Sequence, residues 1–470
     1  MENKITIDEI AKENKNGIRI DDVLLRNALV NSGKLRSDYT NLYILNEADN
    51  IVENIGVAGV KAISRVREEL LDEHTGLIVA SKKIEIALND LIALPSIFIN
   101  TQDFRNTTWV NLENGVMDLQ SLEVIQSKVP NLLFDSKLNF SFREGAINLK
   151  KDVPVFADFC ERSLGVLFEE DGSIKRNGTK LASLLQGIGY LISNIGSLRK
   201  AVFFLGPPAS GKSTLLHLLA KVITPSSNVS AYNFRQFSKS FTMTTVANAK
   251  INIVEEVDCV SRPQMEAFKL LVAGGRLSGE RKYQSDVELK ANVKLAIASN
   301  SLPLFEVGNL APIVDRIHLV IFENTIPSAK REFDLEDRLW QERDIIFSLA
   351  LVEFSKVLQN NGVFKMEAIA ETLLNRLVEE SNSEELFVKG YLKSCPGNNL
   401  AASRVFDAYK AFCRENGFSA KSSHCLYQAI LLAYGSAGEK KKVRDPYVLA
   451  NSSVQGFCGL ALEGGETDGN

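Results

Sequence analysis

The segment AVFFLGPPASGKST at residues 201–214 constrains the chain more than any other stretch of its sequence. Its apolar start is typical of a buried strand, and the amphipathic stretch after it is typical of a helix. Between them lies the spacing G-x-x-x-x-G-K-S, in which backbone N–H groups curl round phosphate oxygens and the helix presents its positive end to the same anion. The sequence therefore predicts a phosphate-binding loop formed by Gly206, Pro207, Pro208, Ala209, Ser210, Gly211, Lys212, Ser213 and Thr214.

The residue types in this loop predict a nucleoside triphosphate with Mg2+ as its ligand. Lys212 has the reach to contact the β- and γ-phosphates, and the Ser213 hydroxyl is placed to ligate the metal. A chance match in a glycine-containing turn is the alternative. The apolar strand before the loop and the stretch LLHLLAKVI after it disfavour that alternative, because the motif requires both.

Composition indicates a globular chain of several domains. The 470 residues are 45% hydrophobic and 24% charged, with a net charge of −4. Residues 389–445 hold ten Lys or Arg against four Asp or Glu, so we expect any nucleic-acid contact to be local to this part. Six scattered cysteines without a C-x-x-C pair favour free thiols. The charged N-terminus and the lack of an 18-residue apolar run predict a cytoplasmic protein without membrane contact.

Hydrophobic periodicity predicts a multidomain α/β protein. Apolar residues have helical spacing before residue 95, Asn114-Gly115 predicts a β-hairpin, and the strands AVFFL, KINIVE, KLAIAS and HLVIF alternate with helices, as in a parallel sheet. The expected parts are an N-terminal helical and β region at 1–150, a helical collar at 151–198, a P-loop ATPase core at 199–330, a helical extension at 331–380, a Ser/Glu-rich linker at 379–385, a C-terminal winged-helix-like domain at 386–462 and a disordered tail at 463–470.

Two further strands of the core end in polar residues suited to nucleotide hydrolysis. The strand KINIVE ends in Glu255 and Glu256, of which one carboxylate can hold the Mg2+ water shell and the other can polarise the attacking water. The strand KLAIAS is followed by Asn300, whose amide can orient that water and contact the γ-phosphate. Solvated glutamates after a core strand, and an asparagine in a turn before Pro303, are the alternatives.

Arg316, in APIVDRIHLVIF, is a candidate for stabilising transition-state charge at the active site of a neighbouring subunit. It follows Asn300 by sixteen residues and immediately precedes another predicted strand. A salt bridge to Asp315 or to another carboxylate is the alternative.

Two basic segments are candidates for DNA contact. SGERKYQSDVELKANVK at 278–294 predicts a β-hairpin with Arg281, Lys282 and Tyr283 near its tip, where cations beside an aromatic ring can meet phosphates and bases. The basic turn GEKKKVRD carries Lys440, Lys441, Lys442 and Arg444, which would form a wing that contacts phosphate. For segment 278–294 the alternative is a solvated hairpin of mixed charge without DNA contact. For GEKKKVRD the alternative is an ordinary solvated run of charges.

The order of these motifs resembles that of superfamily 3 helicases. The phosphate loop GPPASGKS is followed by INIVEE, GGRLSGERKY, LAIASNSLP and an arginine. The match is most similar to the primase-helicase and replication-initiator branch of phages, poxviruses, plasmids and phage-inducible chromosomal islands. ENGVMDL upstream and QGFCGLALE near the end are similar too, so that the resemblance spans roughly residues 100–460.

This resemblance implies an AAA+ core that assembles as a hexameric ring, hydrolyses ATP between subunits and translocates on DNA, 3′ to 5′ in this superfamily. It implies that Lys212 and Ser213 contact phosphate and Mg2+, that Glu255 and Glu256 are the acidic pair, that Asn300 is the first sensor, and that Arg316 acts in trans. The resemblance also makes Lys282 and Tyr283 the tip of a pore hairpin.

The upstream region departs from many relatives in one respect. About 100 residues precede the recognisable region, which is too short for a primase domain, so we expect a separate primase as a partner. The expected function is ATP-dependent helicase and replication initiator of a mobile genetic element. A nucleotide-switched DNA-binding regulator without processive unwinding is the alternative, which the acidic pair disfavours. A small-molecule kinase is disfavoured by the basic C-terminal unit.

Overall fold

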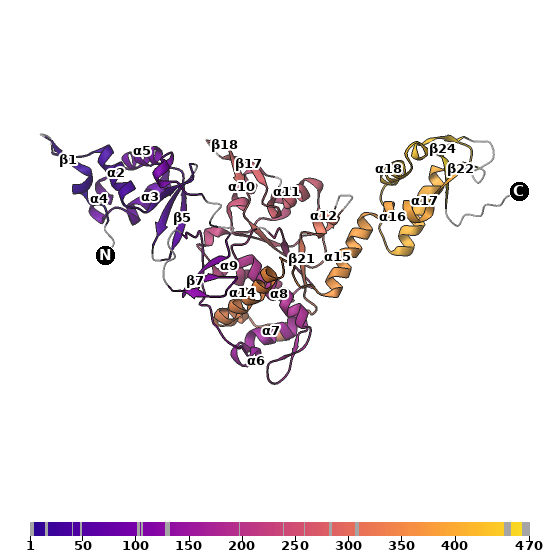
Figure 1. Cartoon of the computed structure of the whole chain (residues 1–470), viewed down its shortest axis with the longest axis horizontal. Helices are drawn as coiled ribbons and strands as arrows, with labels where there is room; N and C mark the ends of the chain where they lie inside the picture. Colours follow the sequence, from indigo (N-terminus) through magenta and orange to yellow (C-terminus); the bar gives the residue numbers. More distant parts are fainter. Residues whose placement is uncertain are drawn as a thin grey trace. The chain divides into compact units, whose positions relative to one another are not determined.

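The computed structural model describes residues 4–14, 17–39, 41–47, 49–100, 104, 107–126, 132–196, 198–237, 239–257, 259–281, 284–305, 310–445 and 453–462. These residues form a multidomain α/β structure with helices, antiparallel sheets and one parallel sheet (Figure 1). Contacts divide the chain into two compact units, one of Met1–Leu304 with Arg316–Glu367 and one of Phe305–Asp315 with Ala368–Asn470. No helix within the described ranges is long and apolar enough to cross a membrane.

The N-terminal part of the first unit has its own core and contains strands that the sequence analysis missed. Helical spacing predicted helices alone before residue 95, but β3, β4 and β5 form an antiparallel sheet. LYILN and IVENIG are short runs with buried β-branched or aromatic residues, which suit strands. The elements are α1 (Ile7–Ile10), β1 (Ala11–Asn14), β2 (Gly17–Ile20), α2 (Asp22–Asn31), β3 (Leu35–Ser37), β4 (Leu42–Asn46), β5 (Ile51–Gly56), α3 (Val60–Glu69), α4 (Glu73–Ile78) and α5 (Ser81–Ile92).

The predicted hairpin around Asn114-Gly115 is confirmed. Strands β6 (Trp109–Leu112) and β7 (Gly115–Asp118) pair across the two-residue turn Glu113-Asn114. They belong to a sheet of order β13-β9-β6-β7-β8, in which β13 follows the phosphate-loop helix directly. The other strands of this sheet are β8 (Val124–Ile125), β9 (Lys137–Leu138) and β13 (Ile223–Thr224).

A parallel sheet of order β14-β15-β19-β12-β21 forms the centre of the first unit, and it includes the four predicted strands. Every residue of β12 is buried, because both faces of the sheet are covered. On one face the ring of Phe203 lies 6.5 Å from that of Phe268 in α11, and on the other Val202 meets Gly187 of α8. The strands are β12 (Ala201–Leu205), β14 (Val229–Ser230), β15 (Ile251–Glu255), β19 (Lys294–Ser299) and β21 (Ile317–Ile321).

Helices and short hairpins surround this sheet. The predicted hairpin at 278–294 is present as β17 and β18, which pair in antiparallel register. The surrounding elements are α6 (Leu149–Asp152), α7 (Pro154–Leu164), β10 (Leu167–Phe168), β11 (Ile174–Arg176), α8 (Gly178–Ile192), α9 (Lys212–Val222), α10 (Ser240–Asn248), β16 (Cys259–Val260), α11 (Arg262–Val272), β17 (Arg276–Arg281), β18 (Gln284–Lys290), β20 (Leu304–Phe305), α13 (Leu335–Gln341) and α14 (Arg343–Gln359).

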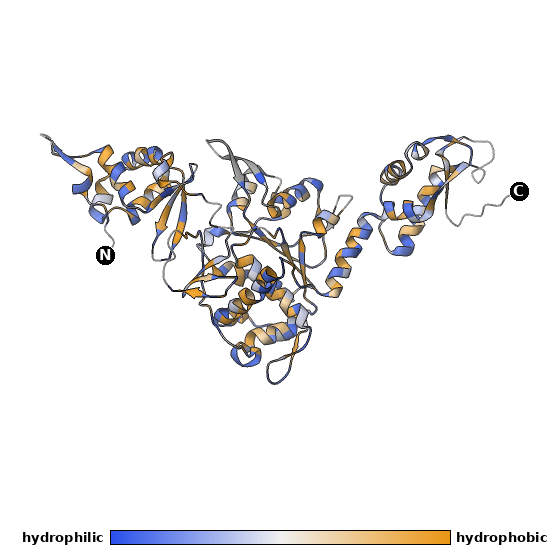
Figure 2. Cartoon of the chain, in the orientation of Figure 1, coloured by the Kyte–Doolittle hydropathy of each residue, from blue (hydrophilic) through white to orange (hydrophobic). Residues whose placement is uncertain are grey.

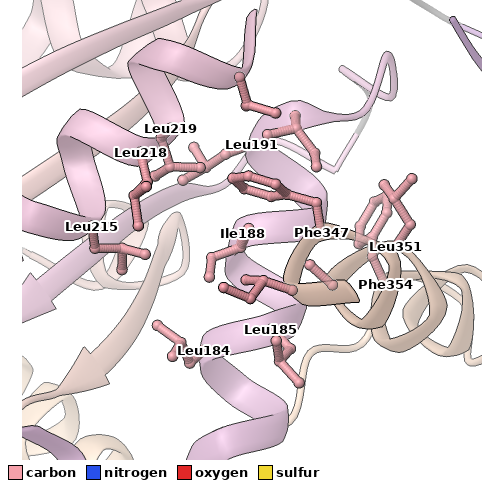
Figure 3. Packing of buried hydrophobic residues seen from close by; sticks show 14 of the residues in the cluster. Leu184, Leu185, Ile188, Leu191, Leu215, Leu218, Leu219, Phe347, Leu351 and Phe354 are labelled. Atoms are coloured by element: carbon pink, nitrogen blue, oxygen red, sulfur yellow. The ribbon is translucent and has the colours of Figure 1, made fainter. Parts of the chain in front are cut away.

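Helix α8 lies at the centre of the largest hydrophobic core. Its side chains Leu184, Leu185, Ile188 and Leu191 gather with leucines of α9 and with Phe347, Leu351 and Phe354 of α14 (Figure 3). This packing holds the helix that follows the phosphate loop in a fixed position, because α9 contributes Leu215, Leu218 and Leu219 to the same core (Figure 3).

The close approach of α8 and α14 gives a stability prediction. A Cβ atom on Gly189 would lie 2.2 Å from the Ala350 carbonyl oxygen and 2.6 Å from the Phe354 Cβ. We expect Gly189→Ala to destabilise the protein by about 1–3 kcal/mol, although alanine is the better helix former. Thermal unfolding measures this, with Gly76→Ala of α4 as the control, since the Cβ there meets nothing closer than 3.7 Å. Equal melting temperatures for the two variants would contradict the packing.

The second unit combines helices with an antiparallel sheet of order β22-β24-β23 around a separate core. Its helices carry both hydrophobic and hydrophilic residues (Figure 2). The segment VFDAYKAFCREN lies in helix α17 (Ala402–Asn416), which Gly417 caps in a left-handed conformation. The elements are α12 (Ala311–Val314), α15 (Ala368–Ser381), α16 (Ser383–Tyr391), β22 (Leu392–Ala401), α17 (Ala402–Asn416), α18 (Ser423–Tyr434), β23 (Lys441–Val443) and β24 (Val454–Leu462).

The linker predicted at 379–385 is wrong, because this segment is helical on both sides of Asn382. Its serines are buried and bonded rather than solvated: Ser381 Oγ accepts from the Leu310 N–H, and Ser383 Oγ lies 2.8 Å from the Tyr409 hydroxyl. The tail predicted at 463–470 lies outside the described residues.

Candidate nucleotide site

Three neighbouring parallel strands end at the same edge of the sheet and bring the predicted site residues together. Leu205 of β12 pairs with Ser299 of β19, and Ala298 of β19 pairs with Glu255 of β15. The phosphate loop follows β12, Glu256 follows β15, and Asn300 follows β19. In open α/β sheets the carboxyl ends of the strands are where ligands bind, so the topology itself makes this edge the candidate site.

A cavity of about 260 Å3 lies at this edge. Its walls include most of the loop, both carboxylates of the acidic pair and the amide after β19. The lining residues are Pro208, Ala209, Ser210, Gly211, Lys212, Ser213, Thr214, Glu255, Glu256, Ala298, Ser299 and Asn300. The sequence thus predicted nearly all of the residues that surround this cavity, including residues about 90 positions apart in the chain.

Lys212 begins α9 and is only 7% exposed. Its ammonium donates to the carbonyl oxygens of Gly206 and Pro207, each at 2.7 Å, and to Asn300 Oδ1 at 3.2 Å. Burial lowers the pKa of this ammonium from its usual value. These acceptors are neutral oxygens, whereas a phosphate in the cavity would offer the ammonium an anionic partner.

Two glycines of the loop lie where there is no room for a side chain. A Cβ on Gly206 would lie 2.3 Å from the Phe322 carbonyl oxygen, and Gly211 has φ +96° with the Phe159 ring 2.5 Å from its missing Cβ. Ala209 also has a positive φ, of 56°. This curled backbone precedes the N-terminus of α9, whose first N–H groups have no partner within the helix. The loop and the helix end therefore form a cradle for an anion.

Glu255 and Glu256 both present exposed carboxylates at the cavity. Glu256 has φ 61°, a strained conformation for a residue with a side chain, and its N–H donates to the Ala298 carbonyl at 3.0 Å. The Ser213 hydroxyl lines the same cavity. Hydroxyl and carboxylate oxygens are ligands that Mg2+ accepts, with phosphate and water completing the octahedron, so Ser213 and Glu255 fit this ion.

A second cavity, of about 200 Å3, also borders the loop and was not predicted from the sequence. It shares Ala209, Gly211 and Thr214 with the first cavity. Its other walls combine apolar side chains with charged ones, drawn from α7 and from the segment that enters α13: Asp158, Phe159, Arg162, Ile326, Arg331, Glu332 and Leu335. These residues are far apart in sequence and follow no common motif, so only the fold identifies them as neighbours.

His217 is a further residue near the site that the sequence analysis did not identify. Its Nε2 lies 3.8 Å from Glu255 Oε1, and its Nδ1 lies 3.0 Å from Glu336 Oε2 of α13. Its place four residues after Ser213 on the same helix is the one sequence signal that could have indicated it.

Arg316 is not near this cavity. It immediately precedes β21, and its carbonyl accepts from the N–H of Ala201 at 2.8 Å, at the start of β12. The phosphate loop follows the opposite end of β12, so the five-residue strand, roughly 16 Å long, separates the two. Arg316 is therefore at the edge of the sheet away from the phosphate loop of its own chain.

The predicted DNA-contacting residues are described in part. Arg281 ends β17, while Lys282 and Tyr283 lie outside the described residues. In the second unit Lys440, Lys441, Lys442 and Arg444 are exposed. The Lys440 ammonium lies 4.7 Å from the centre of the Tyr427 ring, and Lys441 forms an ion pair with Glu439.

Strand alternation orients part of this basic segment. Val443 of β23 is buried, so Lys442 before it points to the opposite, outward face of the strand, and Arg444 directly after the strand is exposed as well.

Comparison with known proteins adds little to this geometry. The family model described as "Family of unknown function (DUF5906)" matches residues 204–310, from the end of β12 past Asn300. No curated protein matches the chain. Two apo structures of the NrS-1 C-terminal region are 13% identical, with TM-scores of 0.45 and 0.44; each covers 93% of this chain, and the alignments span 98% and 99% of those chains. At this level of likeness the neighbours define no activity for the chain.

Proposed function

We propose that the protein is an ATP-dependent DNA helicase that initiates replication of a mobile genetic element. The observation that carries the proposal is the convergence of Lys212, the Glu255–Glu256 pair and Asn300 on one cavity at the ends of three parallel strands. A binding site for phosphate alone needs the loop and its lysine. The two carboxylates and the amide opposite the loop are the groups that hydrolysis of the terminal phosphate requires in addition.

The two cavities that meet at the loop support a nucleoside triphosphate as the ligand. The phosphates fit the first cavity, where the loop N–H groups and Lys212 bind anionic oxygens. The second cavity, with Phe159, Ile326 and Leu335 among its walls, fits a base with an apolar face and polar edge. Gly211 and Thr214 border both cavities. One ligand could therefore extend from the first cavity into the second.

Each side chain at the phosphate end has one role in the proposed reaction. Lys212 binds the β- and γ-phosphate oxygens, and Asn300, 3.2 Å from its ammonium, orients the attacking water. Glu256 accepts the proton of that water. Ser213 and Glu255 would hold Mg2+, which when bound would neutralise charge on the phosphates.

A ring of subunits accounts for the position of Arg316. Within one chain it lies at the sheet edge away from the loop, so it completes a site only if that site belongs to a neighbour. We propose a homo-hexamer with an AAA+ core in which Arg316 stabilises the phosphate charge of the adjacent subunit, as the resemblance to superfamily 3 implies. Movement from 3′ to 5′, a cytoplasmic location and a separate primase are proposals that rest on sequence and resemblance alone.

DNA contact is assigned to the hairpin β17–β18 and to the basic face of the second unit. The hairpin lies between the acidic strand β15 and the Asn300 strand β19 in the chain, and only residues 291–293 separate it from β19, so a change at Asn300 can reach it through that strand. Arg281, Lys282 and Tyr283 are proposed to grip single-stranded DNA. The second unit, a winged-helix-like domain in this proposal, would contact duplex DNA.

Unwinding of a forked DNA duplex tests the proposed function. We expect strand separation that requires hydrolysable ATP and Mg2+ and that is lost in Lys282→Ala while most ATP hydrolysis remains. ATP hydrolysis without strand separation on any fork, and with no effect of Lys282→Ala, would favour a nucleotide-switched DNA-binding protein instead.

The basic face gives a separate prediction for duplex binding. We expect Lys442→Ala with Arg444→Ala to weaken binding and to reduce the slope of log affinity against log salt by about 1 for each lost phosphate contact. Lys410→Ala of α17 is the control, since its ammonium pairs with Asp407. Fluorescence anisotropy at several salt concentrations measures the slope. An unchanged slope would mean that this face does not contact the backbone.

A further inference from the structure

His217 lies between two carboxylates that belong to different elements of the first unit. Its Nδ1 is 3.0 Å from Glu336 Oε2 in α13, within hydrogen-bond distance, and its Nε2 is 3.8 Å from Glu255 Oε1 at the end of β15. The two nitrogens of an imidazole ring point away from each other, so one ring can contact both carboxylates. All three side chains are partly exposed, by 55% for His217, 50% for Glu255 and 37% for Glu336.

The position of His217 along α9 explains why it meets both partners. Ser213, His217 and Lys221 follow one another at four-residue spacing and so share one face of the helix. Ser213 lines the phosphate cavity, whereas Lys221 forms an ion pair with Asp337 of α13 at 3.3 Å and lies 4.9 Å from the centre of the Trp340 ring. The face therefore runs from the metal end of the site to α13, which also contributes Leu335 to the second cavity.

We propose that His217 is a positioning residue that orients the Glu255 carboxylate for the metal. A carboxylate that is half exposed has several accessible rotamers, of which few suit a metal-bound water. The ring, held by its hydrogen bond to Glu336, restricts that choice and links the orientation of Glu255 to α13. A residue that contacts a metal ligand without touching the metal itself can orient that ligand in this way. Loss of such residues typically costs about 10–100-fold in activity or metal affinity.

The inference rests on the proposed function and predicts an effect on the steps that involve Mg2+. We expect His217→Ala to lower kcat for ATP hydrolysis by about 10-fold and to raise KM for Mg2+-ATP, because Glu255 then holds the metal less well. His217→Gln, whose amide can still donate to Glu336 and contact Glu255, should recover part of the loss. Glu336→Ala should lower kcat in the same direction, because it releases the ring from the other side.

Lys221→Ala is the matched control. It removes another polar contact between α9 and α13, one helical turn further on, without touching Glu255. A purely structural role for the contacts between these helices predicts that Lys221→Ala and His217→Ala have equal effects on kcat and on the melting temperature. The positioning role predicts that only His217→Ala lowers kcat.

Binding of a fluorescent, non-hydrolysable ATP analogue provides a readout that does not depend on turnover. Without Mg2+ the wild type and His217→Ala should bind the analogue equally. With Mg2+ the variant should gain about 10-fold less affinity than the wild type. Equal gains, or a kcat for His217→Ala no lower than that for Lys221→Ala, would overturn the inference while leaving the proposed function intact. Absence of ATP hydrolysis by the wild type would overturn both.

Discussion

Replacement of Lys212 by alanine is expected to abolish ATP hydrolysis, with a loss of at least about 10^3-fold in kcat/KM. Lys212 is only 7% exposed and its ammonium is fixed by the Gly206 and Pro207 carbonyls at 2.7 Å, so its charge is already in place at the cavity before substrate arrives. Alanine removes this positive charge from the phosphate cavity. Phosphate release from ATP, measured with and without single-stranded DNA, gives the rate.

The control for this variant is Lys221→Ala, which removes a lysine nine residues further along the same helix. Lys221 is partly exposed and pairs with Asp337, away from the phosphate cavity, so hydrolysis should stay near the wild-type rate. Both variants should retain a cooperative unfolding transition. Wild-type hydrolysis by Lys212→Ala would refute the assignment of the phosphate loop as the site.

Replacement of Arg316 by alanine is expected to lower hydrolysis by about 10^3-fold or more while nucleotide binding is retained. The arginine lies at the start of β21, one strand length from its own loop, so it takes no part in binding by its own subunit. Its loss removes the cation that stabilises the transferring phosphate in the neighbouring site. Equilibrium binding of an ATP analogue and steady-state hydrolysis, measured on the same preparation, separate the two effects.

Mixing the two inactive variants tests whether Arg316 acts across an interface. In a ring assembled at random from equal amounts of Lys212→Ala and Arg316→Ala subunits, about a quarter of the interfaces combine an intact lysine with an intact arginine. We expect hydrolysis to rise above that of either variant alone and to depend on the mixing ratio. No recovery at any ratio would mean that Arg316 acts within its own subunit or has a structural role.

The features that could be predicted from the sequence are those encoded by contiguous residues. The loop GPPASGKS carries its whole geometry in eight positions, and the four predicted parallel strands are mostly apolar, as strands buried on both faces usually are. Glu255 and Asn300 could be assigned because each ends one of these runs, and the carboxyl ends of parallel strands share an edge.

What the sequence could not reveal depends on contacts between distant segments. Segment 379–385 is rich in Ser and Glu, as linkers are. It is nevertheless helical, and Ser381 and Ser383 are buried and bonded to distant residues. Phe159 and Leu335 line the second cavity together, although more than 170 residues separate them in the chain. Nothing in the sequence marks His217 as a site residue, because its contact with Glu336 depends on the packing of α13. Tertiary contacts decide such cases, because local preference is weak in comparison.

The rate of ATP hydrolysis by the wild-type protein, measured with and without single-stranded DNA in the same assembly, tests the central claim most directly. The account predicts hydrolysis that requires Mg2+, rises when DNA is added and disappears in Lys212→Ala. A protein that binds no Mg2+-nucleotide at the edge formed by β12, β15 and β19, or whose hydrolysis is unaffected by loss of Lys212, would contradict it.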